Sequence, residues 1–273
     1  MHKIVIRLLA LATGASVLAA CAQPQGSDDD STAASQSPST SSAALRPTAS
    51  GLISMRELEN AIRRIQNDTD TEMSVALYNG DTLTTAGSLG TLPSWSTVKV
   101  PIAFAALEHC SYSEKYLEQL ITASIEWSDN ASAHTLYSCL WQEGTPMELT
   151  ADAIAPSGTR PAVDPAWGIT KWSAPSQAQY GYYLSTIDQD NVVIEAMKNI
   201  AEDQSYGLGV IKNSAFKGGW SDHTDGSWHT RQFGFFTHNG SAYGVAIVAR
   251  SENGSYADGQ AALTAIAEVL IDD

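Results

Sequence analysis

The chain has 273 residues, with 30 acidic and 15 basic side chains and a formal net charge of −15 at pH 7. Binding to nucleic acid needs clustered lysine and arginine, so this balance argues against a nucleic-acid partner. Once two N-terminal segments are set aside, residues 51–273 are long enough for one domain with a sizeable hydrophobic core.

Residues 1–20 have the layout of a secretory signal peptide. Lys3 and Arg7 give a positive start, and the mostly apolar residues 8–18 form a stretch too short to span a bilayer stably. The following sequence Leu-Ala-Ala-Cys, which ends at Cys21, resembles the bacterial lipobox, in which the cysteine is acylated and becomes the mature N-terminus. The resemblance implies an exported protein anchored by lipid on Cys21 to the outer face of the cell membrane. The alternative is an ordinary signal peptide with a chance cysteine.

Residues 21–50 are rich in Ser, Thr, Ala, Gln, Asp and Pro, and Leu45 is their one large apolar residue. Such a segment buries too little surface to offset the entropy of ordering it. We expect a flexible linker between the lipid anchor and the domain.

Cys110 and Cys139 are the two cysteines left once Cys21 is assigned to lipid. An even pair in an oxidising compartment is a candidate disulfide. The alternative is two buried thiols, because the sequence does not give their separation.

The domain begins with a capping box, Ser54 and Glu57, which predicts the start of a helix. Residues 73–77 alternate in polarity, which predicts a strand, and Asn79-Gly80 predicts a tight hairpin turn. Further along the chain the pattern predicts a strand at 82–86, helical sequence at 98–107, 113–141 and 173–201, strands at 216–220, 229–237 and 243–250, and a helix at 257–271. Because the strands lie at both ends, we predict an α+β fold with one antiparallel sheet flanked by helices and a shortened helical lobe inserted.

The first chemical motif is Ser96-Thr97-Val98-Lys99, which places a hydroxyl and an amine one helical turn apart. A serine hydroxyl is a weak nucleophile that needs a nearby base. Lys99 can be that base if burial among apolar neighbours and a second cation favour its neutral form. Ser-x-x-Lys alone is a weak signal, because Ser214 and Lys217 form a second instance.

The second motif is Ser128-Asp129-Asn130, between two helical stretches. The serine can relay a proton, and the asparagine amide can orient a substrate carbonyl or the lysine. The competing interpretation is a helix N-cap, for which Ser, Asp and Asn are the favoured residues.

The third motif is Lys217-Gly218-Gly219-Trp220, at the first of the C-terminal strands. Glycines inside a strand indicate close approach of a ligand or of another backbone segment. The lysine can bind a carboxylate. The competing interpretation is a bulged strand beside a surface lysine.

The three motifs occur in the order, and in the helix, loop and strand contexts, of penicillin-binding proteins and class A β-lactamases. The sequence resembles that serine β-lactamase superfamily over most of residues 54–273. The resemblance implies that Ser96 is the nucleophile, Lys99 its base and Ser128 the proton relay. It implies an oxyanion hole made by the backbone N–H groups of Ser96 and Trp220. The implied substrate contacts are Asn130, Lys217, Gly218, Gly219, Trp220 and, as a second carboxylate contact on the next strand, Arg231.

Two departures from the family concern substrate binding and turnover. The third motif usually reads Lys-Thr/Ser-Gly, so Gly218 lacks a hydroxyl that helps to hold a substrate carboxylate. Class A enzymes also position a hydrolytic water with a Glu and an Asn on a loop after the second motif, and residues 131–190 contain no Asn. The candidate carboxylates in this region are Glu143, Glu148, Asp152 and Asp164, and none stands in the family pattern. We therefore expect acylation followed by slow release.

Two functions remain open at this stage. The first is a cell-envelope serine hydrolase or transpeptidase-like acyl-enzyme acting on an amide or ester of the β-lactam or peptidoglycan-peptide type. The second is a non-catalytic envelope lipoprotein that uses the same fold for binding. In either case we expect a monomer with no cofactor. His223 and His229 lie close in sequence but lack a companion ligand pattern, so we expect no metal.

Overall fold

The computed structural model describes residues 52–272. The predicted signal peptide, Cys21 and the linker lie outside the described residues. Within residues 52–272, no helix is long and apolar enough to cross a membrane.

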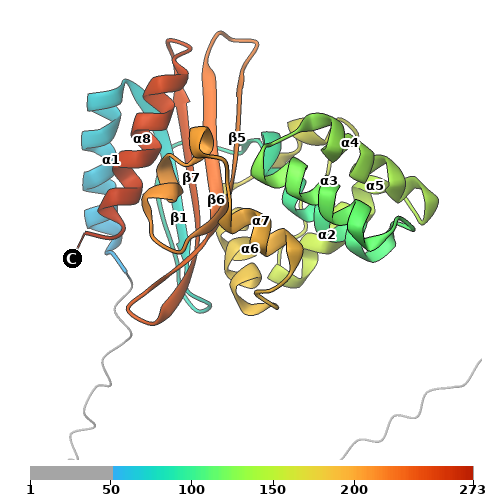
Figure 1. Ribbon diagram of the computed structural model, residues 1–273. Helices are drawn as coiled ribbons and strands as arrows, with labels where there is room; N and C mark the ends of the chain where they lie inside the picture. The colour runs from blue at the N-terminus through green and yellow to red at the C-terminus, as the bar shows by residue number, and fades with distance from the viewer. Residues whose placement is uncertain (1–51, 273) are drawn as a thin grey trace, which may run out of the picture. The chain divides into compact units, whose positions relative to one another are not determined.

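The centre of the domain is a five-stranded antiparallel sheet in the order β2-β1-β7-β6-β5 (Figure 1). The strands are β1 (Thr71–Tyr78), β2 (Leu83–Gly87), β5 (Ala215–Asp222), β6 (Trp228–His238) and β7 (Ser241–Ser251). Strand β1 pairs with β7 along its whole length, from Thr71 opposite Ser251 to Tyr78 opposite Gly244. The prediction of one sheet built from both ends of the domain is therefore confirmed. Strand β5 forms one edge of this sheet.

Helices α1 (Met55–Thr69) and α8 (Tyr256–Val269) cover one face of the sheet (Figure 1). The predicted capping box begins α1, because Ser54 Oγ accepts a hydrogen bond from the N–H of Glu57 at 3.3 Å, and Glu57 Oε2 accepts from the N–H of Ser54 at 3.1 Å. Alternate residues of the central strands point to this face. They pack with the two helices in one hydrophobic cluster that includes Met73, Val75, Leu77, Val245, Ile247 and Ala249.

Helix α6 (Ala174–Thr186) packs against the other face at positions where only glycine fits. A Cβ on Gly181 would lie 2.0 Å from the carbonyl oxygen of Gly234, and a Cβ on Gly244 would lie 2.0 Å from that of Ala178. The helix backbone therefore lies directly on β6 and β7.

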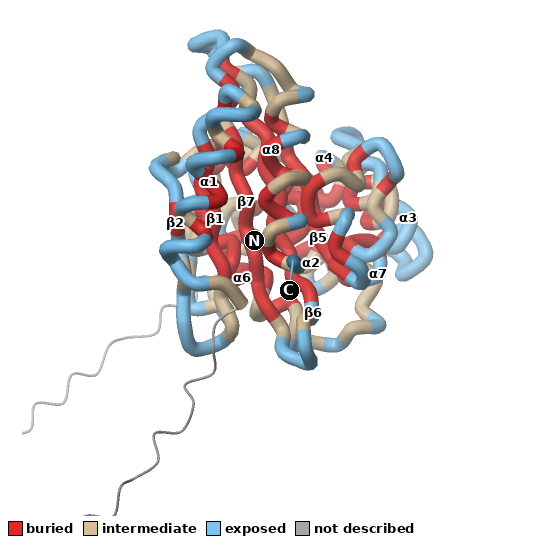
Figure 2. The backbone as a smooth tube through the Cα atoms, turned by 90° about the vertical axis from the view of Figure 1, so that its left-hand side faces the viewer, coloured by how far each residue is buried: buried red, intermediate tan, exposed pale blue. Residues whose placement is uncertain are grey.

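Most of the remaining helices form the inserted helical part beside β5 (Figure 1). They are η1 (Trp95–Val98), α2 (Lys99–His109), α3 (Glu114–Glu126), α4 (Asn130–Cys139), η2 (Leu140–Gln142), α5 (Pro146–Ile154), η3 (Ala155–Ser157), η4 (Trp167–Ile169) and α7 (Val192–Lys198). The short turns η5 (Glu202–Gln204) and η6 (Gly207–Val210) follow α7, and η6 packs against α8. Two short strands, β3 (Leu92–Pro93) and β4 (Lys171–Trp172), pair with each other. Buried residues continue from the sheet into these helices (Figure 2). A second hydrophobic cluster joins the helices to α6.

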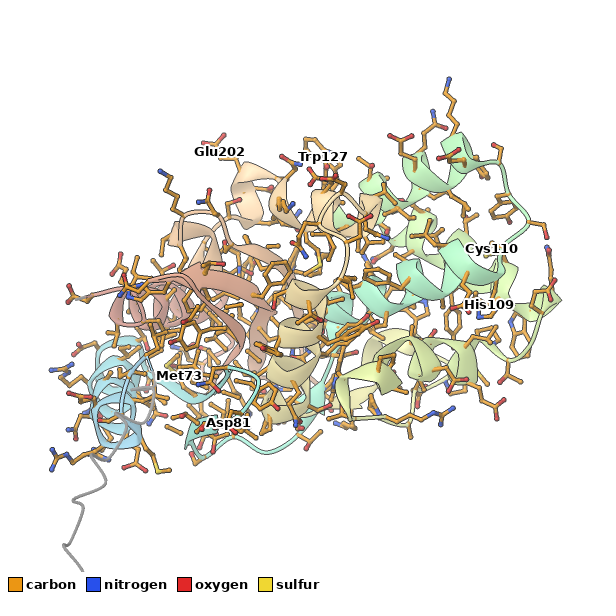
Figure 3. All side chains as sticks on the ribbon, turned by 90° about the horizontal axis from the view of Figure 1, so that it is seen from below. Met73, Asp81, His109, Cys110, Trp127 and Glu202 are labelled. Carbon is orange, nitrogen blue, oxygen red and sulfur yellow. A yellow bond between two sulfur atoms is a disulfide. The ribbon has the colours of Figure 1, made fainter. Side chains whose placement is uncertain are left out.

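The helical sequence predicted at 113–141 is divided in two by residues 127–129, which carry the second motif. Of the two alternatives left open for Cys110 and Cys139, the structure has the disulfide, with Cα atoms 5.7 Å apart. The bond joins the residue after α2 to the last residue of α4, at the end of the helical part away from the sheet (Figure 3). It therefore fixes two of the helices that carry motif residues.

Candidate active site

The nucleophile candidate Ser96 lies in the single turn η1 that leads into α2. Trp95, immediately before it, has a φ of 49°, which is strained for a non-glycine residue and occurs most often at functional sites. Thr97 anchors the turn, because its hydroxyl donates to Ser94 O and accepts from Gln177 Nε2 at 2.8 Å. Thr97 is fully buried whereas Ser96 is half-buried, so the turn is held while the serine stays accessible.

Lys99 is fully buried, and its three N–H groups are all accounted for. Its Nζ donates to Ser128 O at 2.6 Å, to Asn130 Oδ1 at 2.7 Å and to Ser128 Oγ at 3.3 Å. Burial lowers the pKa of Lys99 to about 8, and the nearby carboxylate of Asp129 opposes this shift. A substantial neutral fraction at mildly alkaline pH is what a general base requires.

The loop between α3 and α4, Ser128-Asp129-Asn130, both caps a helix and contacts Lys99. Asp129 is the N-cap of α4, since its Oδ1 accepts from the N–H of Ser132 at 2.6 Å. Ser128 has a φ of 57°, in the left-handed region. Because Asp129 supplies the cap, Ser128 and Asn130 are left to contact Lys99.

Lys217, in β5, is also fully buried. Its Nζ donates to Ser128 Oγ at 3.0 Å and to the carbonyl oxygen of Gly218 at 3.0 Å. Burial lowers the pKa of Lys217 well below its ordinary value, and the charge of Lys99 lowers it further. The Ser128 hydroxyl thus lies within hydrogen-bond distance of two amines, and it can pass a proton between groups on its two sides.

Gly219 lets β5 approach η1 closely. A Cβ at this position would lie 2.8 Å from both the carbonyl oxygen of Ser94 and the nitrogen of Ser96. At Gly218, by contrast, the nearest atom to such a Cβ is Cζ3 of Trp220 at 3.5 Å, an ordinary contact. The approach at Gly219 brings the Ser96 N–H beside an edge strand, whose outward N–H groups have no partner strand.

The role predicted for Arg231 does not fit its position and is corrected here. Its guanidinium is 1% exposed. It donates to the carbonyl oxygens of Pro93 at 2.8 Å, Leu92 at 3.2 Å and Trp172 at 2.8 Å, and to Gln177 Oε1. Arg231 therefore ties β6 to the β3–β4 pair and to α6, and it presents no free N–H pair to a substrate carboxylate.

The four carboxylates singled out after the second motif either bind neighbouring groups or are exposed to solvent. Asp152 pairs with Arg160, whose Nη2 lies 2.8 Å from its Oδ1, and both side chains are more than half exposed. Asp164 Oδ1 accepts from the N–H of Ala166 at 2.8 Å. Glu143 and Glu148 are exposed.

Trp167 is a site residue that the sequence motifs do not indicate. Its ring centroid lies 5.6 Å from the Nζ of Lys99. It belongs to η4, whose carbonyl oxygens at Trp167 and Gly168 each lie 3.4 Å from Ser94 Oγ. An indole in a loop without periodicity gives no sequence signal of its position. The same holds for Gln177, which links Thr97 to Arg231.

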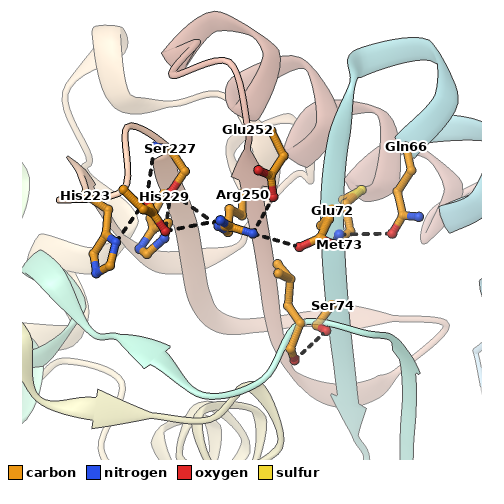
Figure 4. Close-up of polar contacts among 11 residues, drawn as sticks. Gln66, Glu72, Met73, Ser74, His223, Ser227, His229, Arg250 and Glu252 are labelled. Atoms are coloured by element: carbon orange, nitrogen blue, oxygen red, sulfur yellow. Dashed lines mark hydrogen bonds and ion pairs between the residues drawn. The ribbon is translucent and has the colours of Figure 1, made fainter.

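His223 lies in the turn between β5 and β6, and His229 lies beside it near the start of β6 (Figure 4). Their rings stack with centroids 4.8 Å apart, and His229 lies 6.0 Å from the ring of Trp95. His223 Nδ1 is 3.1 Å from Asp225 Oδ1, and Arg250 Nη2 is 3.1 Å from Asp225 Oδ2. His229 is buried, and burial together with its neighbour His223 lowers the pKa of its imidazole to about 4.

The fold is that of solved class A β-lactamases. Among solved structures, the chain is similar to a class A β-lactamase from Bacteroides cellulosilyticus, at 16% identity over 80% of this chain and 97% of that one, with a TM-score of 0.65. It is also similar to a β-lactamase from Chitinophaga pinensis, at 18% identity over 78% and 97%, with a TM-score of 0.61. A class A β-lactamase from Mycobacterium abscessus matches at 13% identity over 78% and 97%, with a TM-score of 0.60. No protein-family model and no curated protein sequence matches the chain. At these identities the likeness establishes the fold, and activity has to be argued from the site.

Proposed function

We propose that this protein is a serine acyl-enzyme of the cell envelope that acts on an amide or ester of the β-lactam or peptidoglycan-peptide type and releases its product slowly. The observation that carries the proposal is the hydrogen-bonded group of Lys99, Ser128 and Lys217 beside the half-buried Ser96. Two fully buried lysines sharing one serine hydroxyl are costly to fold, and catalysis is the use that this arrangement fits.

In the proposed reaction Lys99 has lost one proton and keeps its two shorter hydrogen bonds, to Ser128 O and Asn130 Oδ1, so that its lone pair is free. Ser96 Oγ attacks the carbonyl carbon and its proton passes to this neutral Nζ. The oxyanion accepts hydrogen bonds from the N–H groups of Ser96 and Trp220. Ser128 Oγ gives a proton to the leaving nitrogen or oxygen as its bond to the carbonyl carbon breaks, and Ser128 is reprotonated from the lysines that flank it. The acyl group remains on Ser96 as an ester.

Slow release is supported by what surrounds Lys99. The indole of Trp167 lies against the amine, and the Asp164 carboxylate caps its own turn. Neither arrangement supplies the carboxylate and amide pair that positions a hydrolytic water.

We also propose that the chain is exported and held to the membrane through lipid on Cys21. The site would then lie at the outer face of the membrane.

Intact-mass spectrometry of the full-length protein, incubated with a penicillin or with a fluorophosphonate, tests the proposal. We expect a mass increase equal to the bound probe in the wild type and none in Ser96→Ala, and we expect the penicillin adduct to persist for hours. Circular dichroism of Ser96→Ala checks that the variant is folded.

The alternative is a non-catalytic lipoprotein that binds a ligand at this site. The missing hydroxyl at Gly218 and the absent water-positioning pair favour it. Folded wild-type protein that reacts with neither probe would support this alternative and contradict the acyl-enzyme.

A further inference from the structure

The part of β5 that follows Lys217 carries one aromatic ring, that of Trp220, close to Gly218, where the hydroxyl side chain is missing. The indole of Trp220 lies along the strand beside Gly218, with Cζ3 3.5 Å from the position of a Cβ there. Its ring centroid is 5.8 Å from Lys217 Nζ, which in turn lies 3.0 Å from Ser128 Oγ. The indole is therefore next to the groups that deliver a proton to the leaving group.

Three further rings extend this surface. Trp220 stacks on Tyr256 with centroids 5.8 Å apart and planes at 26°. Trp228 lies 5.4 Å from Tyr256, and the hydroxyl of Tyr206 lies 3.1 Å from that of Tyr256. All four residues are half-buried, so parts of their rings face solvent. We call Trp220, Trp228, Tyr256 and Tyr206 the aromatic surface.

The cations near this surface have few N–H groups left for a substrate anion. Lys99 uses all three on Ser128 and Asn130. Lys217 uses two and directs its remaining charge toward the Trp220 ring. The guanidinium of Arg231 is held by backbone carbonyls in the interior. Among these three cations, the N–H groups without a partner are one on Lys217 and the buried Nε–H of Arg231, so a substrate carboxylate would meet at most the first.

The charge around the aromatic surface also disfavours an anion. The Asp203 carboxylate is close enough to raise the pKa of both Tyr206 and Tyr256, although burial is the larger cause at each. The whole chain carries a formal charge of −15, which repels anionic ligands at low ionic strength.

We propose that the aromatic surface is a specificity site that selects a leaving group that is neutral and bears an aromatic or apolar ring, in preference to one that bears a carboxylate. This inference rests on the proposed acyl-enzyme function and refines the substrate class of the same site. A penicillin, whose leaving group bears a carboxylate, is then expected to acylate Ser96 more slowly than a substrate whose leaving group is neutral and aromatic. Ring faces of Trp and Tyr bind flat apolar groups by stacking and by excluding water.

Two thioesters of the same acyl group test the proposal. One has thioglycolate as leaving group, which ends in a carboxylate, and the other has benzyl thiol, which is neutral and aromatic. In the reaction Ser96 Oγ bonds to the thioester carbon, its proton passes to Lys99, and the C–S bond breaks. The departing sulfur takes a proton through Ser128.

Two readouts separate recognition from chemistry. Acylation rates of the full-length wild-type protein are measured by intact mass, and binding of each thioester to folded Ser96→Ala is measured by calorimetry. We expect the benzyl thioester to react and bind at least about ten-fold better than the thioglycolate. We expect Trp220→Ala to remove that preference and Gly218→Thr to shift it toward the carboxylate, while Trp141→Ala, an exposed tryptophan of η2, leaves it unchanged.

The outcomes are distinguishable. Acylation at equal rates, or faster with thioglycolate, would overturn the specificity site while leaving the acyl-enzyme intact. A benzyl preference in binding without any acylation would support the specificity site and contradict the acyl-enzyme. No binding of either thioester would overturn the specificity site.

Discussion

At the residue scale, the proposed base is an amine whose charged form is disfavoured by burial. Lys99 is fully buried, and its pKa is lowered to about 8 mainly by that burial. A lysine accepts a proton only in its neutral form, which prevails above its pKa. The rate of Ser96 acylation is therefore expected to rise with pH to a plateau, with an inflection near 8, when followed by intact mass between pH 6 and 10. A flat profile over this range would contradict Lys99 as the base.

The two adjacent glycines of β5 give a matched pair of substitutions. Gly219→Ala would place a Cβ 2.8 Å from Ser94 O and Ser96 N, whereas Gly218→Ala meets nothing nearer than 3.5 Å. We expect Gly219→Ala to slow acylation at least about 100-fold, because it displaces an oxyanion donor, and to lower the free energy of unfolding by about 1–3 kcal/mol. Gly218→Ala should stay within about three-fold of wild type in acylation rate, a small change for a substitution that meets only ordinary contacts. Equal effects of the two changes would mean that β5 does not approach Ser96 as described.

At the scale of elements, the disulfide joins two helices that carry motif residues. It closes a loop of 29 residues between Cys110 and Cys139, and in the chain-entropy description such a loop contributes about 3–4 kcal/mol to stability. We expect the double variant with serine at both positions to have a free energy of unfolding lower by that amount, measured by denaturant titration. The unfolded wild-type protein, titrated for thiols without reductant, should show no free thiol at these two positions, and two free thiols there would contradict the bond.

The elements also show what the sequence could and could not predict. The strands at both ends of the domain follow from local periodicity, and the architecture rules then favour pairing them in one sheet. The motifs at Ser96, Ser128 and Lys217 are each weak alone, and their joint meaning comes from the resemblance to a known family. The true role of Arg231 does not follow from local patterns, since its partners Pro93 and Trp172 lie 138 and 59 residues away. The position of Trp167 over Lys99 is likewise set by tertiary packing of an irregular loop.

At the scale of the whole molecule, stability is expected to depend on pH through His229. Its pKa in the folded protein is about 4, against 6.5 for an ordinary histidine, so the unfolded chain binds the proton more tightly. Stability that is present above pH 6.5 is therefore lost as the pH falls toward 4, at up to about 1.4 kcal/mol per pH unit. The groups that face the ring are His223, Asp225, Arg231 and Arg250.

Urea unfolding of wild type and His229→Gln at pH 7 and 4.5 measures this contribution. We expect the wild type to lose more stability than the variant over this interval, and the difference isolates His229 from the carboxylates that titrate in both proteins. Parallel losses in the two proteins would show that His229 is not buried in its neutral form.

The central claim, that Ser96 is an activated nucleophile, is tested most directly by locating the label. Full-length protein reacted with a fluorophosphonate at pH 9 is digested, and its peptides are sequenced by mass spectrometry. The structure predicts modification of Ser96 alone, lost in folded Lys99→Met. Label on other serines, or on none, would contradict the claim.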